Sequence, residues 1–313
     1  AAAAFNSDAF WNQFPNRLVS FDVETNGIGN GVTEFFPLSQ KAVMVVDVKA
    51  DVFTYVVPAK VKNADDSKEY EVRLWADYGL QHAPANVKFE EIVFRNQLDY
   101  VGLNAFEKAD GSSTVKRIFF TCKKPAKDMS ATKWEYGNAE HEFKSDLKIY
   151  VKKSVIDDYK SVAGHEHAGW NRYANQIEYK IPYYVTSAAA PAAAPKPFIK
   201  KKYGTFAREF DTDFGSYFAE EGKGKVVAFV TPISGVESGP GDYGHSTYMV
   251  KMSSIDLNGG ATNDYSYIPA ETGVLLKVLE TEALPVDFYY TIGEKDDVTY
   301  SITGNMMTGI VVK

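Results

Sequence analysis

The sequence predicts a mainly β protein with two domains, a short solenoid followed by an antiparallel β-sandwich. Its 313 residues include 20 Tyr and 20 Phe, and aromatic side chains are favoured on the pleated, half-buried surfaces of sheets. Short apolar runs alternate along the chain with clusters of Gly, Asn, Asp and Pro, which is typical of strands joined by turns. A repeating pattern in the first half indicates stacked turns of chain.

Residues 187–197 mark a boundary between the domains, because three prolines stand there among alanines. Proline fixes φ and removes a backbone donor, and alanine has little surface to bury. This segment is therefore expected to be a semi-rigid, extended linker. The domains are expected at residues 1–186 and 198–313, and each is long enough for its own hydrophobic core.

The second domain is expected to consist of short strands. Six apolar runs are separated by turn-forming residues, and none has helical periodicity, which favours a β-sandwich. These runs are Lys225 to Thr231, Tyr248 to Met252, Val274 to Leu279, Phe288 to Ile292, Val298 to Ile302 and Ile310 to Val312.

The first domain contains a repeat. Residues 89–94 and 115–120 share a pattern with apolar residues at positions 0, 3 and 5, so Ile92 and Ile118 correspond at an interval of 26. An interval of 20 to 50 residues is typical of solenoids. Residues 55–58 and 149–151 fit the same pattern less regularly, and residues 1–50 are expected to form strands that cap the first repeat.

Three segments of the first domain resemble the BspA-like leucine-rich-repeat family of bacterial surface proteins. A strand ending in Pro58 and followed by a Tyr-x-Val hairpin resembles the family's opening element, and the stretch that ends in Ala105-Phe106 is similar to its repeat. The segment from Leu147 to Tyr159, followed by Trp170 and Ile177, is similar to the family's closing element. Arg95, Leu103, Asn104 and the insert 164–168 depart from the repeat pattern.

The resemblance implies a particular organisation for these segments. Phe106 is expected to fill the space between successive coils, and Ser154 and Asp157 are expected to form a capping box that begins a terminal helix. Residues 267–277 and 304–309 resemble a sandwich module found near the ends of such proteins, after which relatives usually continue. The implied role is adhesion, on the surface of or secreted from anaerobic Gram-negative bacteria, without catalysis.

A candidate binding surface follows from strand alternation. If positions 0, 3 and 5 point inward, position 4 faces outward in each coil. Val56, Val93, Phe119 and Tyr150 would then form an exposed ladder, and exposed apolar patches often mark interaction sites. The candidate ligand-binding residues are Val93, Phe119 and Tyr150, with Arg95, Arg117, Lys148 and Lys152 beside them. Glu91 lies in the same exposed flank, which is expected to be charged and mostly basic. Alternatively, such residues only stabilise neighbouring strands.

Composition limits the partners. The formal net charge of −7 opposes binding to nucleic acid, which proteins hold mainly through Lys and Arg. No apolar run reaches the roughly 18 residues of a membrane-spanning helix. The start at Ala1 shows no basic segment followed by an apolar one, so a signal peptide is expected to be absent from this chain or already removed. The single cysteine, Cys122, allows no intrachain disulfide. No cofactor and no oligomeric state follow from the sequence.

Several motifs suggest chemistry but lack a component of the site. Asp22 and Glu24 resemble the first motif of two-metal exonucleases, without the further acidic segments. His165 and His167 are too few ligands for zinc, and residues 256–264 lack the glutamate of a calcium-binding EF-hand. Cys122 lies in a strand-like run, where a structural thiol is more common than a nucleophile. No metal site is therefore predicted.

The predicted function is a non-enzymatic, adhesin-like protein that recognises a host or bacterial protein or glycan. One alternative is a structural piece whose repeats only pack against other domains of a longer surface protein. Another is a glycan-active enzyme, which requires two carboxylates about 5 to 10 Å apart.

Overall fold

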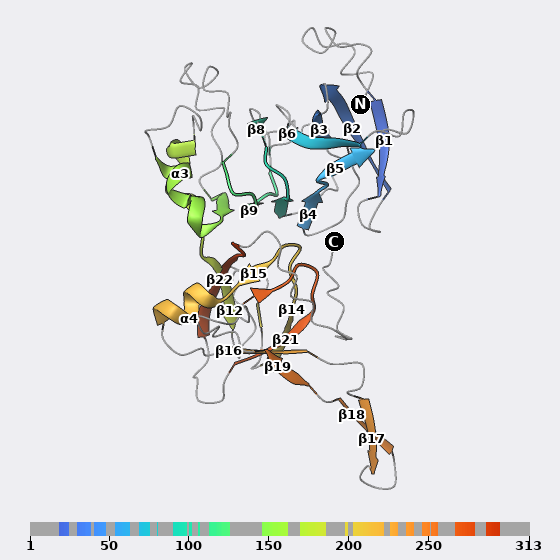
Figure 1. The fold of residues 1–313 in the computed structure, drawn as a ribbon, viewed down its shortest axis with the longest axis vertical. Helices are drawn as coiled ribbons and strands as arrows, with labels where there is room; N and C mark the ends of the chain where they lie inside the picture. The colour runs from blue at the N-terminus through green and yellow to red at the C-terminus, as the bar shows by residue number, and fades with distance from the viewer. Residues whose placement is uncertain are drawn as a thin grey trace. The chain divides into compact units, whose positions relative to one another are not determined.

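The computed structural model describes residues 19–24, 30–38, 41–47, 54–62, 69–75, 80, 90–98, 100–101, 106, 113–125, 146–161, 170–185, 198–199, 203–221, 226–230, 236–240, 246–250, 252–255, 267–278 and 286–294. This part of the chain is mainly β, as predicted, with a few short helices (Figure 1). It divides into two compact units between Tyr179 and Lys180.

One sheet of the first unit is built from the amino-terminal strands and a hairpin. Its order is β1-β2-β3-β6-β5, with β8 also paired to β6. Strands β5 and β6 form the predicted hairpin. Strands β1, β2 and β3 pair antiparallel with one another in that order, and β3 pairs parallel with β6. The bounds are Val19–Glu24 (β1), Asn30–Leu38 (β2), Lys41–Asp47 (β3), Lys60–Lys62 (β5), Glu69–Trp75 (β6) and Tyr100–Val101 (β8).

The other sheet of the first unit is parallel, in the order β11-β10-β9-β7-β4. Ile92 is the partner of Ile118, so the predicted interval of 26 residues is confirmed as strand register. Ile118 is the partner of Ile149 at a longer interval, in line with the less regular fit of that segment. A parallel neighbour requires the chain to return to the same edge after each strand. The strands are Thr54–Val57 (β4), Glu91–Phe94 (β7), Arg117–Phe120 (β9), Lys148–Val151 (β10) and Ile177–Glu178 (β11).

The hydrophobic core lies on one face of this parallel sheet. Positions 3 and 5 of the repeat are buried in it, as predicted, at Ile92 and Phe94 and again at Ile118 and Phe120. The Phe94 and Phe120 rings stack with centroids 5.0 Å apart. Phe106 is also buried and stacks on Trp75 at 5.9 Å, so it fills interior space as the resemblance implied.

Short helices pack against this core after β10. They are η3 (Lys153–Val155), α3 (Ile156–Lys160) and η5 (Trp170–Tyr173). The ring centroid of Tyr159 in α3 lies 6.0 Å from that of Phe120 and 5.3 Å from that of Trp170. The terminal helix is therefore confirmed, but the capping box is wrong: the N-cap of α3 is Val155, because η3 takes up Ser154 within a 3-10 turn.

The second unit contains two larger sheets and a separate hairpin. One sheet has the order β13-β12-β22-β15-β20, the other has the order β14-β21-β16-β19, and β17 pairs only with β18 among the described strands (Figure 1). The bounds are Ile181–Val185 (β12), Phe198–Ile199 (β13), Tyr203–Phe206 (β14), Thr212–Asp213 (β15), Val226–Val230 (β16), Val236–Pro240 (β17), Ser246–Val250 (β18), Ser253–Ile255 (β19), Tyr267–Ile268 (β20), Val274–Val278 (β21) and Val286–Ile292 (β22).

Aromatic side chains from both larger sheets meet in the core of the second unit. The Phe206 ring of β14 lies edge-on to the Tyr290 ring of β22, with centroids 5.2 Å apart. Phe214 contacts both rings and precedes helix α4, Gly215–Glu221. The sequence did not predict this helix, because seven residues are too few for a helical pattern to show.

The boundary between the units differs from the predicted one by seven residues. Strand β12 was assigned to the domain 1–186, but it pairs along its length with β22 of the second unit. Strands β16, β18, β21 and β22 overlap the predicted runs. The linker 187–197 and the runs at 298–302 and 310–312 lie outside the described residues.

Candidate functional site

The candidate surface is the face of the parallel sheet opposite its core. Strand register aligns two rows of side chains on that face, and one of them is the predicted ladder. Val56, Val93, Phe119 and Tyr150 are successive partners in the pairing of β4, β7, β9 and β10. A second row, two residues earlier, consists of Thr54, Glu91, Arg117 and Lys148.

Val56 is half-buried and the other three residues of the apolar row are buried, so the prediction of an exposed ladder is wrong. Val93 and Phe119 are 0% exposed and Tyr150 is 3% exposed. The rings of Phe119 and Tyr150 stack with centroids 5.2 Å apart and an interplanar angle of 18°. Parallel sheets are usually covered on both faces, and their strands then lack a polar side. The assignment of these residues to one face was right, but their accessibility was not.

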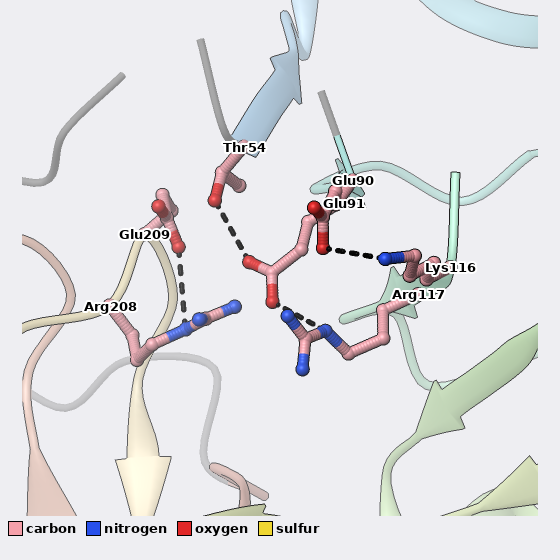
Figure 2. Close-up of polar contacts among 7 residues, drawn as sticks. All are labelled: Thr54, Glu90, Glu91, Lys116, Arg117, Arg208 and Glu209. Atoms are coloured by element: carbon pink, nitrogen blue, oxygen red, sulfur yellow. Dashed lines mark hydrogen bonds and ion pairs between the residues drawn. The ribbon is translucent and has the colours of Figure 1, made fainter. Parts of the chain in front are cut away.

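A buried charge pair lies in the polar row (Figure 2). Glu91 accepts a hydrogen bond from the Thr54 hydroxyl at 2.8 Å, and its other carboxylate oxygen lies 2.8 Å from Nε of Arg117. The side chain of Glu91 is 1% exposed and that of Arg117 is 11% exposed. Burying a charge is costly unless it is paired and hydrogen-bonded, so these three residues depend on one another.

The flank of the ladder is not mostly basic, because acidic partners lie beside its cations. Arg117 pairs with Glu91, and Lys148 pairs with Glu178 of β11. Glu90 and Lys116, which immediately precede β7 and β9, form a second and more exposed ion pair at 3.4 Å (Figure 2).

The two remaining candidates, Arg95 and Lys152, lie at the carboxyl ends of β7 and β10. Arg95 is half-buried and Lys152 is 3% exposed, so Lys152 cannot present its ammonium group to a large ligand. The neighbouring Lys123, Lys124 and Lys153 are exposed. The ammonium group of Lys153 lies 5.5 Å from the centre of the Tyr179 ring.

The thiol of Cys122 has the character of a structural group. It is half-buried, and its Sγ lies 3.1 Å from the carbonyl oxygen of Lys124. Burial raises the pKa of the Cys122 thiol. Burial also raises the pKa of Tyr159 well above its usual value, and the nearby Cys122 adds to this shift. The thiolate, which is the nucleophilic form, is therefore disfavoured.

Polar groups in the second unit also form local pairs. Asp213 accepts a hydrogen bond from the backbone of Gly215 at the start of α4, at 2.7 Å. Burial, together with the charge of Asp213, raises the pKa of Tyr267 to about 12. Arg208 and Glu209 are almost completely buried and their charged groups lie 3.4 Å apart (Figure 2).

The other motifs add no further site. Asp22 and Glu24 lie in strand β1, while His165, His167 and residues 256–264 lie outside the described residues. In the described part of the chain, no three Asp, Glu, His or Cys side chains are grouped as metal ligands. The helices found there are also too short or too polar to cross a bilayer.

Sequence reasoning missed the role of Glu91, which it treated as part of an exposed flank. A signal was present, because the first residues of β7 and β9 occupy the same repeat position and carry opposite charges. In a parallel sheet, equivalent positions of successive coils become neighbours. Opposite charges at one repeat position therefore indicate a pair across the strands.

Comparisons with known proteins give little. No family model matches the chain, and no curated protein matches it. A solved structure, a leucine-rich cell surface protein from Faecalibacterium prausnitzii A2-165, aligns with 14% identity and a TM-score of 0.26. The alignment covers 44% of this chain and 27% of that protein.

Proposed function

We propose that this chain is a non-enzymatic, adhesin-like binding protein of the bacterial cell surface, which recognises an extracellular protein or glycan. In this proposal residues 54–178 form a short leucine-rich-repeat solenoid, and the second unit forms a β-sandwich that acts as a spacer or as a second recognition unit. The surface location rests on the sequence resemblance to BspA-like proteins.

The observation that carries the proposal is the register of the parallel sheet. Val57, Phe94, Phe120 and Val151 are successive partners, so β4, β7, β9 and β10 end at one level. The turns that follow these strands therefore lie side by side and form one border. Stacked repeats use such extended surfaces for binding, because each repeat adds side chains in line with the preceding ones.

The buried ladder moves the proposed binding surface from the sheet face to its borders. A ligand cannot reach Phe119 or Val93 without displacing the side chains that cover them. The turns contain exposed residues, for example Lys123 and Lys153. Recognition is therefore assigned to the turns, and the ladder is assigned to stability.

A structural role is the second candidate, and burial on both sheet faces supports it. Ile118 and Phe120 are buried on one face, and Phe119 is buried on the other. A sheet covered in this way suits a piece that only packs within a larger surface protein. We favour binding because partly exposed residues follow β7, and exposed residues follow β9 and β10, at the same border.

Catalysis is not part of the proposal. A glycan-active enzyme needs a pair of carboxylates on either side of the scissile bond. Glu91, the most deeply buried carboxylate of the candidate face, is already engaged by Thr54 and Arg117. Its geometry suits a structural charge pair better than a general acid or base.

A test of the function uses an array of glycans and extracellular-matrix proteins probed with the purified, labelled full chain. We expect saturable binding to one class of molecule, and competition by the same unlabelled chain. The control is the chain unfolded in urea and then diluted onto the array, which should lose the signal. Absence of saturable binding to any element of the array would favour the structural role.

A further inference from the structure

We propose that the carboxyl-terminal border of the parallel sheet binds a sulfated, linear glycan through the side chains of Arg95, Lys123, Lys124 and Lys153, which we call the cationic border. This inference rests on the proposed function and names its site and ligand class.

Strand register places the three turns that carry these residues side by side. Phe94, Phe120 and Val151 are aligned partners, and Arg95, Thr121 and Lys152 follow them directly. Adjacent strands are about 4.8 Å apart, so β7 and β10 are separated by roughly 10 Å. The cationic border is therefore a narrow row that crosses three strand ends.

Acidic residues are absent directly after these strands, whereas the opposite strand ends carry both signs of charge, for example Glu91 beside Arg117. The three residues after β7, β9 and β10 include no acid, since they read Arg-Asn-Gln, Thr-Cys-Lys and Lys-Lys-Ser. Glu90 and Asp146 lie near the opposite ends of β7 and β10. The whole chain has a net charge of −7, so a cationic row contrasts with the rest of the molecule. Such local fields attract ligands of opposite charge.

The turns after β7 and β9, which carry Arg95, Lys123 and Lys124, are hydrogen-bonded to each other or to the turn after β4. Asn96 donates a hydrogen bond to the carbonyl oxygen of Ala59, which lies in the turn after β4. Gln97 donates to the carbonyl oxygen of Pro125, in the turn after β9, at 2.6 Å. Thr121 donates its backbone N–H to the carbonyl oxygen of Phe94 at 3.1 Å. Because the turns are held in place before binding, less conformational entropy is lost when a ligand binds.

Access also differs between the lysines. Lys123, Lys124 and Lys153 are exposed and Arg95 is partly exposed, so all four can approach a ligand. Lys152 is buried, so it is given no direct contact with the ligand. Direct contacts are therefore assigned to the cationic border alone.

The shape of the row favours a linear sulfated glycan over other anions. A protein partner ordinarily needs about 800 Å² of contact on each side, which a row crossing three strand ends does not supply. Single-stranded nucleic acid is ordinarily held by a charged groove with stacking aromatic rings. A sulfated sugar chain needs only spaced cations and a narrow track.

The test compares two double variants of the full chain in heparin binding. Lys123→Ser/Lys153→Ser removes two charges from the cationic border. The control, Lys116→Ser/Lys160→Ser, removes two exposed lysines elsewhere in the same unit, so both variants have the same net charge. Isothermal titration is done at several salt concentrations, and circular dichroism melts confirm that the variants are folded.

We expect the border variant to lose about tenfold or more in heparin affinity and the control less than about threefold. The slope of log affinity against log salt should fall by roughly two units only in the border variant, because two ion contacts are lost. Chemically desulfated heparin should bind much more weakly to the unmodified chain. A fold defect alone would not change the salt slope in this selective way.

Three results would overturn the inference. They are equal heparin affinity of the two variants, no heparin binding at all, and tighter binding of single-stranded DNA or polyglutamate than of heparin at equal salt. The proposed function is judged separately on the array. Saturable binding there to an uncharged glycan or a protein, with no heparin binding, would reject the cationic border and leave the function standing.

Discussion

Glu91 occupies the first position of β7, on the face where sequence alternation predicted solvent. Its carboxylate is enclosed by the Thr54 hydroxyl and the Arg117 guanidinium. A buried pair often contributes little net stability relative to an apolar pair, but removal of one partner leaves an uncompensated charge. The neighbouring Glu90–Lys116 pair has the same chemistry one residue earlier and is more exposed.

We expect Arg117→Ala to lower the free energy of unfolding by about 3 to 5 kcal/mol, because Glu91 stays buried without its partner. Lys116→Ala is the matched control and should cost less than about 1 kcal/mol, as is usual for exposed pairs. Urea unfolding followed by circular dichroism measures both values. Equal losses would show that Glu91 is not buried as described.

The phenol of Tyr267 makes the stability of the folded chain depend on pH. Its pKa is raised to about 12 by burial and by the charge of Asp213. The folded chain therefore holds this proton more tightly than the unfolded chain, whose tyrosines titrate near pH 10. The resulting stabilisation is fully present below about pH 10 and is lost as the pH rises toward 12.

The Tyr267→Phe variant has no phenol proton to lose, so its stability should fall less steeply between pH 10 and 12 than that of the unmodified chain. The difference in free energy of unfolding between the two proteins, measured in urea at pH 9 and at pH 11.5, should shrink at the higher pH. The other titrating groups are common to both proteins and cancel in this difference. A constant difference would contradict the assigned pKa.

At the scale of elements, strands β7, β9 and β10 each contribute to both faces of one sheet. Phe120 packs in the core, while Phe119 stacks on Tyr150 on the opposite face. The sequence treated these two faces as core and solvent. The distinction matters because it reverses the expected effect of substitutions in the ladder.

The double variant Phe119→Ser/Tyr150→Ser should lower the melting temperature by roughly 10 °C or more. It removes two buried aromatic side chains, each of which typically contributes a few kcal/mol. If the ladder were exposed, the same variant would melt nearly as the unmodified chain does. Thermal melts distinguish these results, and Lys153→Ser is an exposed control expected to change little.

The sequence predicted the repeat interval and the inward positions, because strand register follows from apolar periodicity. The hairpin β5–β6 followed from the resemblance to BspA-like proteins. Periodicity also predicted the alignment of Val93 with Phe119. It did not predict their burial, because periodicity indicates which residues share a face and not what covers that face. The adjacent apolar residues Phe119 and Phe120 in β9 are typical of a strand that is buried on both faces, and strict alternation of core and solvent does not account for them.

At the scale of the whole molecule, the division between the units depends on strand pairing more than on composition. The Ala/Pro run is conspicuous in the sequence, yet β12 lies before it and pairs with β22. Ile181 of β12 is buried opposite Tyr290 of β22, which is also buried. A cut at the linker would remove one strand from the sheet that contains β22.

We therefore expect a fragment of residues 180–313 to be more stable than one of residues 187–313. Loss of β12 exposes β22 along one edge and removes backbone hydrogen bonds, and an unpaired edge strand also favours aggregation. The longer fragment should show a higher melting temperature and remain monodisperse in size-exclusion chromatography with light scattering. Equal behaviour of the two fragments would mean that β12 contributes nothing to the second unit, and the boundary would then lie at the linker after all.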